Sequence, residues 1–283
     1  MRFPKYVPAG SSIGGDLKQM LSYSHAWLIL HQTPYIGNNL YPPLATLLFT
    51  PLLIVKFSWA YKLITFVNVL CYILITLIIP MRMVKEGSIS ASLLLVIGTG
   101  LFSYGFQFEL ERGQFNIIAM TFCFLAICIY HSHVKYRYLA YALFTLSVQL
   151  KIYPIIFIIM LIKDWRDWKT NLKKFFALIA VNLALFFVLG PVIFLDFINS
   201  LKAQMINPYI WKGNHSIRSF ILWASNIATQ HGWTWPNKYS GWIQLALLVL
   251  VVVCIGLIML QDYRRDVHDV NSYLLLACTL GGC

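Results

Sequence analysis

The chain has 283 residues, of which 59% are hydrophobic and 11% are charged, and its mean hydropathy is +0.69. An ordinary soluble domain carries about 25% charged residues, so this composition excludes a conventional soluble fold. The net charge of +12 does not indicate a nucleic-acid partner, because the basic residues lie in short segments between apolar blocks. We expect an integral, multi-pass membrane protein whose main partner is the lipid bilayer.

The first 56 residues are expected to form a separate region at the outer membrane face. Residues 16–30 have the apolar spacing of an amphipathic helix that lies along the membrane surface. Residues 44–55 are apolar, but as a helix they would cover only about 18 Å. They also contain Pro51, so we expect a half-inserted segment or a kinked extension of the next helix.

The region 57–283 consists of apolar blocks of about the length that a helix needs to cross a bilayer. Backbone groups inside a bilayer must satisfy one another, so the sequence predicts an all-α bundle of membrane helices. The blocks cover residues 57–80, 89–106, 115–130, 138–162 with an interruption, 175–197, 242–260 and a run that starts at 273. Because the last run stops about halfway through a span, we expect a fragment that lacks a first helix and the C-terminal helices.

Lysine and arginine indicate the orientation of these blocks, because short cytoplasmic loops are enriched in both residues. Four basic segments are therefore expected on the cytoplasmic side: 82–85, 135–137, 163–174 and 264–265. The remaining connections are then expected on the opposite, outer side: 109–114, the break near Lys151 and a long outer loop at 196–241.

Polar residues on the expected outer side are concentrated into five short strings. These are Gly-Gly-Asp at 14–16, Tyr-Pro-Pro at 41–43, Glu-Leu-Glu-Arg-Gly-Gln-Phe-Asn at 109–116, Lys-Ile-Tyr-Pro at 151–154 and Gly-Asn-His-Ser-Ile-Arg at 213–218. Polar groups at membrane depth are costly and usually line a functional cavity. The strings therefore predict a site that is open to one membrane face.

In this order the five strings resemble those of the polyprenol-phosphate-mannose-dependent mannosyltransferases of glycosyltransferase family 87, from Asp16 to about Arg218. The resemblance implies a GT-C membrane fold without a cofactor. It implies the transfer of a hexose, mannose in the family, from a polyprenyl-phosphate donor to a hydroxyl of a glycolipid or polysaccharide, with inversion. The active site would face outward from a bacterial inner membrane.

An acceptor hydroxyl is a weak nucleophile, so a carboxylate within hydrogen-bond reach is needed to take its proton. With the resemblance, Asp16 is the expected catalytic base. Without it, Asp16 and the following Leu-Lys-Gln-Met are ordinary sequence for a helix N-cap.

The donor leaves as a lipid phosphate, which requires positive charge at the site. The groups expected to bind the donor phosphate are Lys151, Arg112, Arg218 and His215. An ion pair with Glu109 or Glu111 is an equally good interpretation of Arg112.

The remaining polar side chains of the five strings are expected to bind the sugar or the acceptor. They are Gln114, Asn116, Tyr41, Tyr153, Asn214 and Glu111. Gln114 and Asn116 could instead cap the helix that follows them. No metal site is expected, because His131 and His133 have no carboxylate or cysteine at ligand spacing.

Two other classes of protein remain as alternatives. A transporter or lipid flippase would carry ionisable residues along a path through the membrane midplane and paired interrupted helices in its two halves. Here the interrupted block 138–162 has no counterpart. A non-catalytic membrane subunit would have no reason to repeat polar strings on one face.

Overall fold

The structure is a computed structural model that describes residues 13–35, 37, 39–79, 100–132, 134–162, 164, 166–206, 217–235, 239–247, 249–250, 253 and 257. Within these ranges the chain forms helices and turns and no strand, which confirms the all-α prediction. The chain divides into two compact units, one formed by Ser11–Asn207 and the other by Met1–Gly10 together with Pro208–Cys283.

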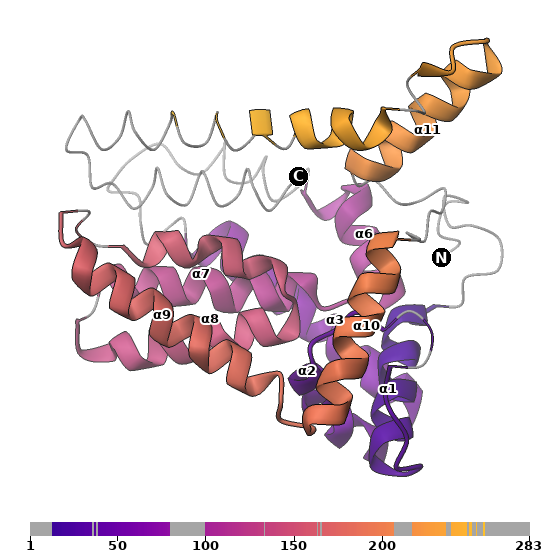
Figure 1. The fold of residues 1–283 in the computed structure, drawn as a ribbon. Coiled ribbons are helices and arrows are strands. Elements are labelled where there is room, and N and C mark those ends of the chain that lie inside the picture. The colour runs from indigo at the N-terminus through magenta and orange to yellow at the C-terminus, as the bar shows by residue number, and fades with distance from the viewer. Residues whose placement is uncertain are drawn as a thin grey trace. The chain divides into compact units, whose positions relative to one another are not determined.

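The first unit holds the helices that carry most of the predicted site (Figure 1). They are α1 (Gly15–Leu28), α2 (Pro43–Phe49), the 3₁₀ helix η1 (Thr50–Ile54), α3 (Phe57–Ile73), the π-helical turn η2 (Leu74–Ile78), α6 (Tyr104–Arg112), α7 (Asn116–Ser132), the 3₁₀ helix η3 (Val134–Tyr136), α8 (Arg137–Leu150), the 3₁₀ helix η4 (Tyr153–Leu161), α9 (Trp168–Leu185) and α10 (Pro191–Ile206). The second unit contains α11 (Ile217–Gln230).

Several apolar blocks fold as the sequence predicts. The block 57–80 forms α3 and η2, the block 115–130 forms α7, and the block 138–162 is interrupted at Lys151 between α8 and η4. Within the described residues, Phe57–Ile78 is long and apolar enough to cross a membrane. The helices α6 and α7, bent by 112° at their break, would add a second such element if they form one broken span.

Other boundaries were wrong. The block 175–197 is not one helix, because α9 ends at Leu185 and α10 begins at Pro191, after Gly190 with a φ of 102°. Helix α6 runs on to Arg112, so only Gly113 to Phe115 connect it to α7 where a connection over 109–114 was expected. The described residues of the expected outer loop at 196–241 include the end of α10 and all of α11, and its place on the outer side stays a prediction. Residues 80–99 and 258–283 lie outside the described residues.

Two of the basic segments lie at the same end of the helix bundle. The Nε2 atom of His131, in the last turn of α7, lies 2.8 Å from the carbonyl oxygen of Met160 near the end of η4. The ammonium of Lys174, in the second turn of α9, donates to the hydroxyl of Tyr130 at 2.7 Å. The basic residues at the start of α8 and of α9 therefore gather around the end of α7, and Lys151 lies at the far end of α8.

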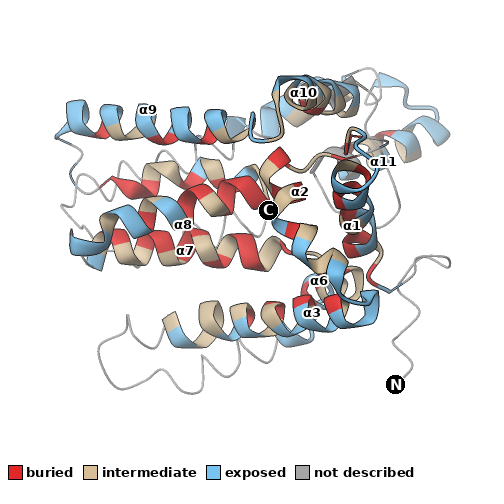
Figure 2. Cartoon of the chain, turned by 90° about the horizontal axis from the view of Figure 1, so that it is seen from below, coloured by how far each residue is buried: buried red, intermediate tan, exposed pale blue. Residues whose placement is uncertain are grey.

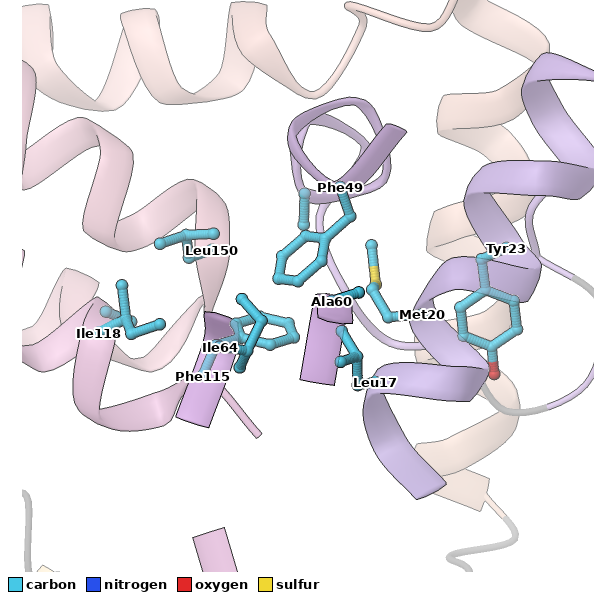
Figure 3. Packing of buried hydrophobic residues seen from close by; sticks show 11 residues of the cluster. Leu17, Met20, Tyr23, Phe49, Ala60, Ile64, Phe115, Ile118 and Leu150 are labelled. Atoms are coloured by element: carbon cyan, nitrogen blue, oxygen red, sulfur yellow. The ribbon is translucent and has the colours of Figure 1, made fainter. Parts of the chain in front are cut away.

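A hydrophobic cluster joins α1, α2, α3, α7 and α8 (Figure 3). Leu17 and Met20 of α1 pack with Phe49 and with Phe115, which is fully buried and precedes α7. Figure 2 shows buried residues on facing sides of α7 and α8. The apolar face of α1 therefore packs into the core of this unit, and no contact in the structure tests its predicted place on a membrane surface.

Two glycines in the left-handed conformation allow α1 and α6 to approach closely. Gly14, with a φ of 72°, is the N-cap of α1, and Gly113, with a φ of 65°, is the C-cap of α6. The amide of Gly14 donates to the carbonyl of Glu111 at 2.7 Å. A Cβ atom on Gly113 would lie 3.0 Å from the Cβ of Leu17 and 3.5 Å from the Cα of Gly14. This contact leaves no room for a side chain.

We predict that Gly113→Ala lowers the free energy of unfolding by about 1 to 2 kcal/mol, because an L-residue in the left-handed region costs that much. The matched control is Gly105→Ala in the same helix, where an added Cβ meets no atom within 4 Å. Thermal unfolding of both variants in detergent measures the difference. Equal unfolding temperatures for the two variants would contradict the role given to Gly113.

Candidate active site

Asp16 lies buried in the first turn of α1 and is held by two side chains that flank Gly113. The guanidinium of Arg112 forms an ion pair with its Oδ1 atom, and the amide Nε2 of Gln114 donates to Oδ2 at 2.5 Å. Because Gly14 occupies the N-cap and Asp16 makes no capping bond, the N-cap interpretation of Asp16 is wrong. Both carboxylate oxygens are oriented by donors from one turn of chain.

The partner of Arg112 also differs from the sequence-based alternative. An ion pair with Glu109 or Glu111 was expected if Arg112 did not bind phosphate, but the carboxylate that it contacts is Asp16. Arg112 is the last residue of α6, and its guanidinium lies beside Gly15. A Cβ atom added at Gly15 would lie 3.7 Å from Cζ of Arg112. The close approach of α1 and α6 therefore selects Asp16 as the partner.

Glu109 has a structural role that the sequence did not reveal. Its buried carboxylate accepts from the backbone amide of Ile117 at 3.1 Å and from Nδ2 of Asn116 at 2.8 Å. The first turn of α7 is thus capped by a carboxylate from the preceding helix, whereas the alternative interpretation of Gln114 and Asn116 made them the caps. A negative group is also favourable beside the positive end of a helix dipole.

Four side chains form a continuous hydrogen-bonded chain across the bend between α6 and α7. Gln114 donates from Nε2 to Asp16 and accepts at Oε1 from Asn116, which also donates to Glu109. The chain thus has a carboxylate at each end and two amides between them. Because each amide donates toward a carboxylate, the network fixes the orientation of both acids.

Lys151 lies where α8 ends and the backbone becomes extended, with φ −147° and ψ 135°. Its ammonium lies 4.4 Å from the ring centroid of Tyr41 and 5.2 Å from that of Phe115, and it is 3.4 Å from the hydroxyl of Tyr41. Aromatic faces attract a cation at these distances. Nearby, the Tyr153 hydroxyl lies 3.4 Å from the carbonyl of Asn116, so Tyr153 of the 151–154 string borders the network.

Tyr41 is positioned by a loop with its own buried contacts. Its backbone amide donates to Oδ1 of Asn39 at 3.0 Å, and its carbonyl accepts from the hydroxyl of Tyr35 at 2.8 Å. Burial raises the pKa of the Tyr41 phenol, and the charges of Asp16 and Glu109 raise it further. Tyr41 therefore stays protonated at neutral pH and offers a hydroxyl near Lys151.

Two residues of α3 donate hydrogen bonds to the backbone of the bend between α6 and α7. Neither belongs to the five polar strings. The hydroxyl of Tyr61 donates to the carbonyl of Leu110 at 2.9 Å, and the amide of Asn68 donates to the carbonyl of Gln114 at 2.7 Å. They are seven residues apart, about two helical turns, and so share one face of α3. A buried asparagine within an apolar block is the sequence signal that points to such a role.

The structure describes only some of the other predicted residues. Glu111 contributes the backbone carbonyl that binds Gly14, and no side-chain role for it is tested. Asn214 and His215 lie outside the described residues, and so does the side chain of Arg218 at the start of α11. Within the described part of the chain, no group of three or more His, Cys, Asp or Glu side chains is arranged to hold a metal ion.

We predict that Asn116→Asp lowers the free energy of unfolding by about 1 to 3 kcal/mol, because it removes the donor to Glu109 and leaves buried acceptors facing each other. Adding Glu109→Gln should restore most of the loss. The new amide donates to the new carboxylate and still accepts from Ile117. Thermal unfolding of both single variants and the double variant measures the coupling, and additive losses would disprove the network.

Comparison with known proteins identifies the family of the chain. No curated protein and no solved structure matches the chain. The sequence model of glycosyltransferase family 87 matches residues 39–282, which include every predicted site residue except Asp16. This match favours a glycosyltransferase over the transporter alternative. Enzymes of this family are membrane proteins, in agreement with the apolar helix Phe57–Ile78. The chain belongs to glycosyltransferase family 87.

Proposed function

We propose that the protein transfers a hexose, with mannose as the expected sugar, from a polyprenyl-phosphate donor to a hydroxyl of a glycolipid or polysaccharide. The transfer proceeds with inversion at the outer face of a bacterial inner membrane. The observation that carries this proposal is the buried Asp16 carboxylate, oriented by Arg112 and Gln114 in the same site as the Lys151 ammonium.

Asp16 acts as the general base. The acceptor hydroxyl gives its proton to the carboxylate while its oxygen bonds to the anomeric carbon of the sugar. The bond from that carbon to the phosphate oxygen breaks on the opposite face, so one displacement inverts the anomeric configuration. A base that is already oriented by Arg112 and Gln114 needs little reorganisation during this step.

Lys151 stabilises the departing lipid phosphate. Its ammonium is fixed between the rings of Tyr41 and Phe115, and no carboxylate lies within 4.0 Å of it among the described residues. The cation is therefore not neutralised by an ion pair before the donor arrives. The Tyr41 hydroxyl, which stays protonated, is a second donor to a phosphate oxygen.

The other predicted residues keep their expected binding roles in this proposal. Arg112 acts mainly through Asp16 and is also a candidate for the phosphate, as are Arg218 and His215. Sugar and acceptor hydroxyls are expected to bond to the remaining polar side chains of the five strings. These are Gln114, Asn116, Tyr153, Glu111 and Asn214.

We predict that Asp16→Asn reduces transfer at least about a hundredfold, because the amide keeps the size of the side chain but cannot take a proton. The measurement is the transfer of labelled mannose from polyprenyl-phosphate mannose by the purified protein in detergent. Asp167→Asn is the matched control, since Asp167 caps α9 through the amide of Thr170 and asparagine is also a good cap. Full activity of Asp16→Asn would rule out Asp16 as the base.

We predict that Lys151→Met lowers the transfer rate at least about tenfold while the protein remains folded, because methionine fits the aromatic niche but lacks the charge. Lys151→Arg should retain more activity than Lys151→Met. The same assay, run over a range of donor concentrations, separates loss of binding from loss of rate. Unchanged kinetics for Lys151→Met would remove Lys151 from the donor site.

A further inference from the structure

Helices α8 and α9 lie side by side and run in the same direction. The amide Nε2 of Gln149 lies 3.1 Å from both the backbone and the side-chain oxygen of Asn182. Tyr141 and Lys174, a pair with the same separation of 33 residues, line one groove between the two helices. This constant offset means that the two helices are parallel and keep their register from the basic end of the bundle toward Lys151.

A groove of about 500 Å³ opens along this pair of helices. Its walls are almost entirely apolar and include Leu146 of α8 and Leu178 and Val181 of α9. Lys174 lines the same groove one turn before Leu178. Its charge therefore lies at the end of the groove nearest the start of α9, which is called the basic end below. The groove is thus an elongated apolar surface that carries one cation at a defined end.

The basic end of the groove has more positive charge than the described residues balance. Lys174 and Arg137 both approach the ring of Tyr130, at 5.4 Å and 5.7 Å from its centroid. No carboxylate lies within 4.0 Å of either cation among the described residues, and the Nε atom of Arg137 is buried there without a hydrogen-bond partner. The carboxylate of Asp167, which is near Lys174, caps the amide of Thr170. The two cations are therefore placed to bind an added anion.

We propose that this groove binds an anionic phospholipid, with an acyl chain along the apolar walls and the headgroup phosphate at Lys174 and Arg137. An acyl chain gains little by leaving other lipid chains, so the apolar walls alone would not select one lipid. The selection comes from the charge, since basic residues between membrane helices on the cytoplasmic side, where these segments are expected, bind anionic headgroups. The groove is separate from Asp16 and Lys151, but the choice of a phospholipid over the prenyl chain of the donor rests on the proposed function.

The position of the cations argues against the prenyl chain of the donor as the occupant. In the proposed reaction the donor phosphate meets Lys151, which lies at the opposite end of α8 from Arg137. A prenyl chain that entered the groove from there would reach Lys174 with its apolar end. It would leave both cations without an anion, whereas a phospholipid satisfies the apolar walls and the charge together.

The test measures lipid binding to the full chain in detergent by native mass spectrometry. Dioleoyl phosphatidylglycerol and dioleoyl phosphatidylcholine have the same acyl chains and differ in headgroup charge. We expect at least about fivefold tighter binding of phosphatidylglycerol. The preference should disappear in Lys174→Met and persist in Lys169→Met, which removes an equal charge whose ammonium instead lies over the ring of Trp168.

A second pair of variants tests the apolar walls. Ala177→Trp should fill the groove and weaken phosphatidylglycerol binding at least about fivefold, whereas Ile179→Trp, an exposed position of α9 that does not line the groove, should not. Equal affinity of the wild-type protein for the two lipids would overturn the proposal, and this comparison needs no variant. Displacement of the lipid by inorganic phosphate alone, or binding of a polyprenyl phosphate but not of phosphatidylglycerol, would also overturn it.

Discussion

The backbone contact between Gly14 and Gly113 determines the geometry of the candidate site. Both residues have positive φ, and neither could carry a side chain without strain or overlap. Asp16 follows the first glycine by two residues, while Arg112 and Gln114 flank the second. Once the two glycines meet, the carboxylate is brought within reach of both donors. The ion pair from Arg112 and the hydrogen bond from the Gln114 amide are thus consequences of one close approach between α1 and α6.

That approach requires a sharp bend between α6 and α7, which leaves helix ends that must be satisfied inside the protein. The backbone groups of the bend are bonded by side chains from three directions. Glu109 accepts from the start of α7, while Tyr61 and Asn68 of α3 donate to carbonyls on either side of Gly113. In an apolar environment such groups are costly if unpaired. Glu109 therefore serves both purposes, since it pairs a backbone amide of the bend and also belongs to the side-chain network of the site.

The sequence predicted those features that depend on local composition. Apolar length located α3 and α7, and a lysine before Tyr-Pro located the break after α8. Charge distribution grouped Asp16, the 109–116 string and Lys151 on one side, and in the structure they share one site. The sequence did not predict those features that depend on residues that are neighbours only in the folded protein. A polar string was interpreted as a connection although half of it is helix α6, and the cap from Glu109 and the partner of Arg112 depend on the bend.

The two cations of the candidate site have different environments. The guanidinium of Arg112 has the planar shape that suits a carboxylate, and it is paired with Asp16. Lys151 is a point charge between aromatic rings, near enough to Asp16 to interact with it electrostatically. The ion pair orients the Asp16 carboxylate, whereas among the described residues no carboxylate lies within 4.0 Å of the Lys151 ammonium. Of the two cations, Lys151 is therefore the one without a carboxylate partner in that part of the chain.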